Sequence, residues 1–323
     1  SKIGTDGSDI YLFQFLSGAV CALKTLPIDE IKPQIPTFES TLISIALSSP
    51  PFTTPAGRPI RSLVARSMIL VFGRGESKGL FDTVNKLLIS AGDPKERDAV
   101  RISAFYCIGE LMGNYGSQVM SFMVELSILA IKVYRSTSGN PLLRYHALLA
   151  LSRAISSTGR ALTDQAVKDV HKNMRSALLD KALSVQRAAA SVLIGLYPNT
   201  VVPPPSGSGP APSTAMLSHV EMESLIAQAI KSFDDSEIDT STRLSLANLV
   251  GHLLSSSQVP RPVAPSTSKA ATTSTSTQSQ DDSLSVGAKV QQEIIAKPLL
   301  SPREMLVSLG TWMNKQATTR KQR

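Results

Sequence analysis

The sequence predicts an all-α protein, an α-solenoid of antiparallel helix pairs stacked into an α-α superhelix. Three observations lead to this fold class. Residues 100–111 carry apolar or small side chains at Ala104, Cys107, Ile108 and Leu111, which are offsets that share one face of a helix. Similar stretches recur along the 323 residues. Aromatic residues make up only 5% of the chain, and aliphatic residues dominate, as in stacked helical repeats.

The spacing of these stretches identifies the kind of repeat. They begin at residues 60, 100, 143, 185 and 242, at intervals of 40, 43, 42 and 57. Three of the four intervals fall within the 40–47 residues of HEAT and armadillo helix-pair repeats. The long interval contains a Pro/Gly-rich insert at residues 198–213, and without it about 41 residues remain. The sequence therefore favours HEAT-type antiparallel helix pairs.

Taken in order, the chain alternates amphipathic stretches with breaks at proline, glycine and polar residues. Residues 31–36 contain two prolines and are expected to be a connector, because proline has no N–H to donate. The stretch at residues 73–79 resembles a phosphate-binding loop only faintly and is interpreted as a turn between repeats. The helices are predicted at residues 10–26, 38–47, 60–71, 80–91, 100–115, 119–135, 143–151, 164–179, 185–193, 217–233 and 242–250.

We expect three segments in the chain. Residues 1–254 form the solenoid, with about five to six helix pairs and the insert at 198–213. Residues 255–285 are a disordered Ser/Thr/Pro-rich linker, because a segment with fourteen Ser or Thr among residues 255–283 cannot bury a core. Residues 286–323 begin a further helical repeat that is expected to be truncated, with a capping box at 301–304.

Small residues and one row of arginines carry the packing predictions. Ala104, Ala147 and Ala189 should be buried and let neighbouring helices approach closely. Asp180 lies in a turn, where its carboxylate can accept backbone N–H groups of the next helix. The arginines stand in first turns of second helices, where the helix dipole disfavours a cation, so either they form a ladder with acidic or carbonyl partners or they are solvated. These arginines are Arg101, Arg144 and Arg187.

Charge and composition argue against several classes of protein. The net charge is +8, but residues 256–323 contribute +5 and residues 1–255 only +3, so a basic nucleic-acid-binding face on the fold is disfavoured. Cys21 and Cys107 both lie in apolar helical patterns and are interpreted as reduced, buried side chains. The longest apolar helix expected, residues 119–134, carries two charges and is shorter than the roughly 20 residues that span a bilayer.

No catalytic, cofactor-binding or metal-binding residue is predicted, and the chain is not expected to be an enzyme. The four histidines lie on separate predicted helices and are interpreted as surface or half-buried side chains. The adjacent pairs Asp234-Asp235 and Asp281-Asp282 would not face each other on a helix. We expect instead a shallow protein-contact surface on successive first helices, with exposed lysines at Lys86, Lys132, Lys168 and Lys231.

Two stretches resemble a particular family. Residues 171–181, running into Val185 and Ala188-Ala189, resemble a characteristic N-terminal segment of the large HEAT-repeat accessory proteins of the type-1 clathrin adaptor. Residues 60–65 and 102–109 resemble the preceding repeats of that family in order, so that the resemblance covers about residues 10–255. The linker and the insert have no counterpart in the family pattern and suggest a fungal member.

The resemblance implies a non-enzymatic scaffold in vesicle traffic between the trans-Golgi network and endosomes. The implied partners are the type-1 clathrin adaptor and its accessory coat proteins, with no nucleic acid, no small-molecule substrate and no cofactor. The implied location is cytoplasmic, peripheral at the trans-Golgi network, endosomes and clathrin-coated vesicles through these partners, and homo-oligomers of the full-length chain are compatible with it. The alternative, which rests on the fold alone, is a HEAT-repeat scaffold of another pathway, such as a nuclear transport receptor or a phosphatase scaffold.

Overall fold

The structure is a computed structural model. It describes residues 8–74, 77–158, 162–197, 219–233 and 238–257, together with residues 303, 304, 307, 310, 311 and 314. Within this described part of the chain the regular elements are helices and no strand is present, which confirms the predicted all-α class. The helices are α1 Ser8–Thr25, α2 Ile28–Ile31, η1 Lys32–Gln34, α3 Ile35–Ala46, α4 Arg58–Phe72, α5 Ser77–Gly92, α6 Asp98–Val119, η2 Met120–Phe122, α7 Met123–Ser136, α8 Pro141–Thr158, α9 Asp164–Ala177, α10 Leu183–Leu196, α11 His219–Phe233 and α12 Thr240–Ser257.

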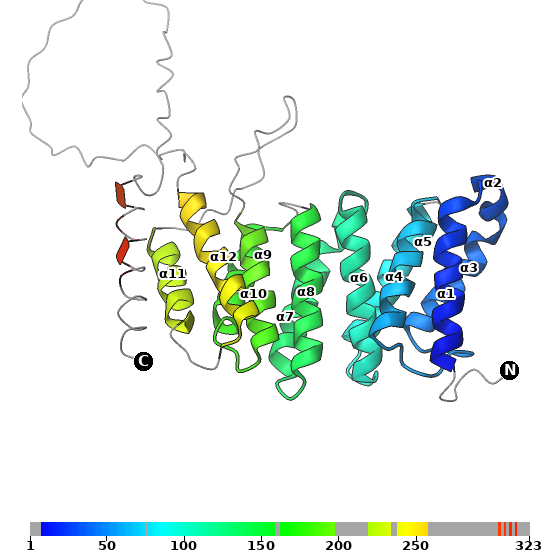
Figure 1. Cartoon of the computed structure of the whole chain (residues 1–323), viewed down its shortest axis with the longest axis horizontal. Helices are drawn as coiled ribbons and strands as arrows, with labels where there is room; N and C mark the ends of the chain where they lie inside the picture. The colour runs from blue at the N-terminus through cyan, green and yellow to red at the C-terminus, as the bar shows by residue number, and fades with distance from the viewer. Residues whose placement is uncertain are drawn as a thin grey trace, which may run out of the picture. The chain divides into compact units, whose positions relative to one another are not determined.

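Residues 1–253 form one compact unit in which the helices stack in two layers. In the second-helix layer, α1 packs on α4, α4 on α6, α6 on α8 and α8 on α10, and Figure 1 shows these helices side by side in this order. In the first-helix layer, α3, α5, α7 and α9 follow one another. Each first helix also packs on the second helix that follows it, as α5 does on α6. Repeats therefore contact mainly their neighbours, as an α-solenoid requires.

Small residues set the spacing within the second-helix layer. Ala104, Ala147 and Ala189 are completely buried, which confirms the sequence prediction. A close approach also occurs between α6 and α8. A Cβ atom built on Gly109 would lie 3.0 Å from the Cα of Ala150, so only glycine permits this separation without a shift.

Of the two alternatives for the arginines, the structure shows the ladder with acidic or carbonyl partners, and two of the three arginines join successive repeats. The Arg144 guanidinium pairs with the Asp180 carboxylate, and Arg187 Nη1 lies 2.8 Å from Asp239 Oδ2. Arg101 instead donates from Nε to the Ala91 carbonyl at 3.1 Å and lies 3.4 Å from Asp98. Here the contact between repeats joins the starts of α6 and α8. The Asn140 side-chain amide, just before α8, donates to Asp98 Oδ2 on α6 at 2.7 Å.

The side chains at these contacts also accept N–H groups at or just before the starts of the second helices. Asp180 Oδ1 accepts from the Ala182 N–H at 2.9 Å, as the sequence predicted for this carboxylate. Asp239 Oδ1 accepts from the Thr242 N–H at 2.8 Å, and Asn140 Oδ1 accepts from the Leu143 N–H at 3.0 Å. One polar side chain per turn therefore satisfies an unpaired N–H at a helix start and holds the neighbouring repeat.

The local predictions fail at several boundaries. Residues 31–36 are not an extended connector, because α2, η1 and the start of α3 make them helical. Pro36 lies in the first turn of α3, where proline needs no N–H partner. Helix α6 continues to Val119 through a non-helical φ/ψ pair at Tyr115 (φ −120°, ψ 23°). Residues 255–257, predicted as linker, are the end of α12.

A second unit comprises residues 254–323. Most of it, including the predicted linker at 258–285, lies outside the described residues, as does the insert at 198–213. Residues 303, 304, 307, 310, 311 and 314 are helical, and Thr311 Oγ1 donates to the Val307 carbonyl at 2.8 Å. The predicted division into solenoid, linker and truncated repeat stays a prediction.

One stretch of the described chain is long and apolar enough to cross a membrane by length and composition. It runs from Asp98 to Ser136, with a mean hydropathy of 1.3. It is not one straight helix, because it comprises α6, η2 and α7 with the break at Tyr115. Helix α6 packs on α5 and α8, and α7 packs on α8. The buried apolar side chains of this stretch therefore belong to the solenoid core.

Candidate protein-interaction groove

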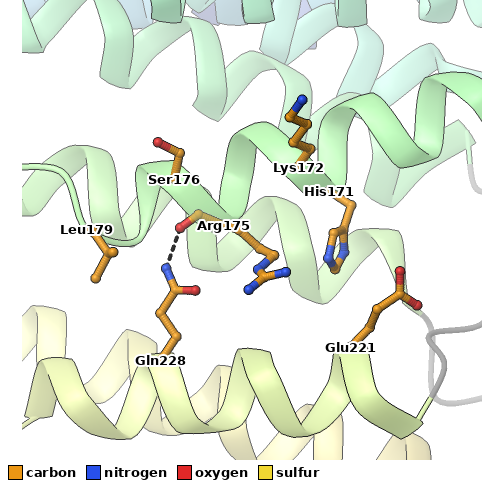
Figure 2. A pocket seen from close by; sticks show the side chains of 7 residues that line it. All are labelled: His171, Lys172, Arg175, Ser176, Leu179, Glu221 and Gln228. Atoms are coloured by element: carbon orange, nitrogen blue, oxygen red, sulfur yellow. Dashed lines mark hydrogen bonds between the residues drawn. The ribbon is translucent and has the colours of Figure 1, made fainter.

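An open groove lies between α9 and α11, two first helices that follow one another in the solenoid. It has a volume of about 360 Å³ and is lined by His171, Lys172, Arg175, Ser176, Leu179, Glu221 and Gln228. Figure 2 shows His171 and Arg175 pointing from α9 toward α11, with Glu221 and Gln228 pointing back toward them. The groove combines polar groups from both helices with the exposed apolar side chain of Leu179.

His171 is the buried polar side chain of this groove. Its Nδ1 lies 2.5 Å from the Tyr197 hydroxyl, and the two rings meet edge to face with centroids 5.7 Å apart. Burial lowers the pKa of His171, with a smaller opposing effect of Glu221, so the ring is neutral at pH 7. Burial also raises the pKa of Tyr197, which keeps its proton. A hydroxyl that donates to Nδ1 leaves the single N–H of the neutral ring on Nε2.

His171 Nε2 has no hydrogen-bond partner among the described residues, although it is buried. An unsatisfied buried hydrogen-bonding group costs free energy, so this nitrogen favours a partner supplied from outside. In the tautomer in which the Tyr197 hydroxyl donates to Nδ1, that partner is an acceptor such as a carbonyl or carboxylate oxygen. The sequence could not indicate this, because Tyr197 lies 26 residues away on a different element.

Arg175 holds the two walls of the groove together. Its Nη2 donates to Ser224 Oγ at 2.7 Å, and its carbonyl accepts from Gln228 Nε2 at 2.5 Å. Figure 2 shows this second bond as the dashed line between α11 and α9. The guanidinium has five N–H donors, so the bond to Ser224 leaves others for a carboxylate or carbonyl. The exposed Lys172 adds a second positive charge on α9.

The expected lysine surface is present in part. Lys86 on α5, Lys132 on α7 and Lys168 on α9 are exposed on successive first helices, as the sequence predicted. The side chain of Lys231 lies outside the description. Lys168 precedes the groove residue Lys172 by four positions on α9, so the lysine surface and the groove share this helix.

The interpretation of the histidines was partly wrong. His146 and His171 are buried, although the pattern favoured surface or half-buried positions, because each stands at a core-facing offset of its helix. His252 is half-buried, and its Nε2 lies 2.5 Å from the Tyr197 carbonyl oxygen. The side chain of His219 is not described. No group of three His, Cys, Asp or Glu side chains suited to a metal ion occurs among the described residues.

The cysteines also differ from one another. Cys107 is buried, and burial raises the pKa of its thiol to about 12, so it remains a protonated core residue. Cys21 is exposed on α1, so the prediction that it is buried was wrong. The apolar pattern alone could not indicate this exposure, because α1 has apolar residues on several faces.

Comparison with known proteins assigns the chain to no family. No family model matches the chain. Protein SWEETIE of Arabidopsis thaliana is 25% identical over 244 residues, which are 75% of this chain and 10% of that protein. The chain therefore spans about a tenth of the length of this relative.

Two solved structures resemble the chain. One is an engineered protein, with a TM-score of 0.43, 14% identity and coverage of 78% of this chain and 93% of that one. The other is a designed armadillo repeat protein, with a TM-score of 0.38, 10% identity and coverage of 74% of this chain and 99% of that one. With the stacked helix pairs described above, the chain is a helical repeat protein with the fold of an all-α solenoid.

Proposed function

We propose that this chain is a segment of a non-enzymatic scaffold that supports clathrin-adaptor-dependent traffic between the trans-Golgi network and endosomes. It binds the type-1 adaptor or adaptor-associated coat proteins along its stacked helices. The location is cytoplasmic and peripheral at these membranes, through the partners. The observation that carries the scaffold part is the open groove between α9 and α11, which continues the exposed surface of the first-helix layer.

The fold supports a protein-binding role. Stacked helix pairs present exposed positions over many repeats, and partners of such solenoids spread along that surface instead of filling one deep pocket.

The traffic role is supported by the resemblance of residues 60–65, 102–109 and 171–181 to the large adaptor-accessory proteins. The last of these stretches provides five of the seven groove residues, His171, Lys172, Arg175, Ser176 and Leu179. The part of the chain that carries the resemblance therefore also forms one wall of the groove.

The groove fits an extended segment of a partner protein. A carboxylate or carbonyl oxygen of the segment would accept hydrogen bonds from Arg175 and from His171 Nε2, while an apolar side chain would cover Leu179. The exposed lysines Lys86, Lys132 and Lys168 add a shallow contact surface. Each single lysine should contribute less than about 1 kcal/mol, as exposed charges at the edge of an interface do.

The test uses tagged full-length protein in its own cells. One variant reverses two groove charges, Lys172→Glu with Arg175→Glu, and a second reverses Lys86, Lys132 and Lys168 to Glu together. The matched control is Lys95→Glu, an exposed lysine in the turn before α6. The measurements are co-purification of adaptor subunits, co-localisation with the type-1 adaptor and helical content of the purified proteins.

We expect the parent and the control to recover adaptor subunits, and at least one of the two variants to lose them with unchanged helical content. Recovery of phosphatase subunits or nuclear transport factors in place of adaptor subunits would support the alternative scaffold. If both variants recruit the adaptor normally, this segment is a spacer and the contact sites lie elsewhere in the full-length protein.

A further inference from the structure

Two arginines lie in the first turn of α4, in the second-helix layer and more than 100 residues before the groove. Arg58 is exposed and Arg61 is half-buried, and the first turn of α4 contains no acidic residue. The N-terminal end of a helix carries a partial positive charge, so two cations there are unfavourable. Neither arginine has an ion pair within the described part of the chain. Arg61 Nη1 donates to the Ala56 carbonyl at 3.0 Å, whereas its buried Nε has no partner there.

A third arginine reaches the same region from α8. The Arg153 guanidinium lies over the ring of Tyr106, with its Cζ 5.5 Å from the ring centroid. Its Nη1 lies 2.7 Å from Glu110 Oε1. Tyr106 and Glu110 come from α6, so the cluster spans three successive second helices, α4, α6 and α8.

Helix α4 packs on α6 and α6 packs on α8, so the three arginines lie on adjacent helices, and His146 lies beside Tyr106 in this region. Its ring lies 5.9 Å from that of Tyr106, centroid to centroid. The pKa of His146 is lowered to about 4. Burial is the main cause, and the positive charges of Arg61, Arg153 and Arg58 contribute the rest. The ring is therefore neutral at pH 7. Three guanidinium charges then stand against the single carboxylate of Glu110, a local excess of two positive charges.

We infer that Arg58, Arg61, Tyr106 and Arg153 form a docking site for an extended acidic peptide segment of a partner protein, laid across α4, α6 and α8. Carboxylates of the segment pair with Arg58 and Arg61 and offset the adverse charge at the start of α4. Tyr106 provides a half-buried aromatic surface beside them. This acidic-segment site lies in the other helix layer from the groove, and it holds whichever pathway the scaffold serves.

Charge complementarity selects this occupant. The excess is local, because residues 1–255 carry a net charge of only +3, so a long polyanion such as nucleic acid would find no continuous basic face. A short segment needs only the few positive charges of the cluster. An anionic membrane surface would attract the exposed Arg58, but a flat surface would make little contact with the half-buried side chains of Arg61 and Tyr106.

The experiment measures binding of a fluorescent peptide of alternating Glu and Gly to the full chain by anisotropy, at low and at physiological salt. A matched peptide of alternating Gln and Gly has the same length without the charge. We expect the chain to bind the Glu peptide and not the Gln peptide. The exposed-site variant Arg58→Glu should weaken binding by roughly tenfold, equivalent to about 1.4 kcal/mol. The matched control Lys24→Glu, a charge reversal at an exposed lysine in the last turn of α1, should leave it unchanged.

A variant that is expected to strengthen binding separates docking from a structural role. Glu110→Gln removes the only carboxylate of the cluster, and it should tighten binding of the Glu peptide. A cluster that only stabilises the fold would not gain affinity when Arg153 loses its ion pair. Circular dichroism confirms that each variant retains its helices, and Arg58 has no hydrogen bond to lose in the described structure.

Three results would overturn the inference. The first is no binding of the Glu peptide by the parent chain. The second is equal weakening by Arg58→Glu and Lys24→Glu, which would show a non-specific charge effect. The third is binding of phosphatidylserine vesicles without binding of the peptide, which would assign the cluster to a membrane surface.

Discussion

The Arg144 guanidinium and the Asp180 carboxylate, 36 residues apart in the chain, are paired where only 11% and 7% of their side chains are exposed. The pair joins the start of α8 to the turn before α10. The equivalent pair in the next repeat, Arg187 with Asp239, is more open, at 32% and 48%. The same two residue types in the same register therefore form an interior contact in one repeat and a surface contact in the next.

The buried pair should be far more sensitive to mutation than the open one. Asp180→Ala leaves the Arg144 charge buried without its partner and removes the cap of the Ala182 N–H, which should lower the free energy of unfolding by about 3 kcal/mol or more. Urea unfolding followed by circular dichroism measures this. Asp180→Asn keeps the cap and loses the charge, so it should fall between the parent and the alanine variant. Asp239→Ala should cost less than Asp180→Ala, and the reverse order would contradict the assignment.

The core of α10 should not accept a charge. Ala189 is completely buried, so Ala189→Glu places an unpaired carboxylate in an apolar seam and should cost several kcal/mol. Ser191→Glu, at an exposed position on the same helix, is the matched control and should leave thermal unfolding nearly unchanged. A melting temperature of Ala189→Glu within a degree or two of the parent would show that the assigned core face is wrong.

Two glycines of α6 should respond to alanine in opposite directions. A Cβ on Gly116 would lie 2.4 Å from Ser157 Oγ, whose hydroxyl donates to the Met112 carbonyl at 2.5 Å, so Gly116→Ala forces the helices apart. We expect a loss of about 1–3 kcal/mol. A Cβ on Gly113 would lie an ordinary 3.8 Å from the Cβ of Arg153. Gly113→Ala should therefore be neutral or stabilising by up to about 1 kcal/mol, because alanine favours the helix. Denaturant midpoints of both variants give the comparison.

Stability should fall on acidification because of His146. Its pKa is about 4 in the folded protein and near 6.5 when unfolded. Between these values the unfolded chain binds a proton that the folded chain does not, so the free energy of unfolding falls as the pH decreases from about 6.5 to about 4. The loss from this group is at most about 3 kcal/mol, and above pH 6.5 the group contributes no pH dependence.

His146→Gln isolates this contribution. Unfolding measured at several pH values in this window should show a shallower slope for the variant than for the parent. Some slope should remain, because burial also lowers the pKa of His171. A His146→Gln slope as steep as that of the parent would mean that His146 is protonated or exposed in the folded protein.

The sequence by itself determined the helices and the period at which they repeat. Both are local properties, because the apolar offsets of 3 to 4 residues and the proline and glycine breaks act within one helix or turn. The 40–43 residue spacing then determined the solenoid, since a helix pair cannot bury its apolar face alone. The cap at Asp180 and the burial of Ala104, Ala147 and Ala189 followed from the same local pattern.

Only the tertiary structure decided which polar groups meet. The partner of each arginine lies in another repeat, Asp180 for Arg144 and Asp239 for Arg187, and sequence pattern holds no distance between repeats. The bond of His171 to Tyr197, the groove between α9 and α11, and the cluster of Arg58, Arg61 and Arg153 arise in the same way. They depend on how closely successive helices pack. That separation is set by side-chain volume at positions such as Gly109, and a hydropathy pattern does not contain it.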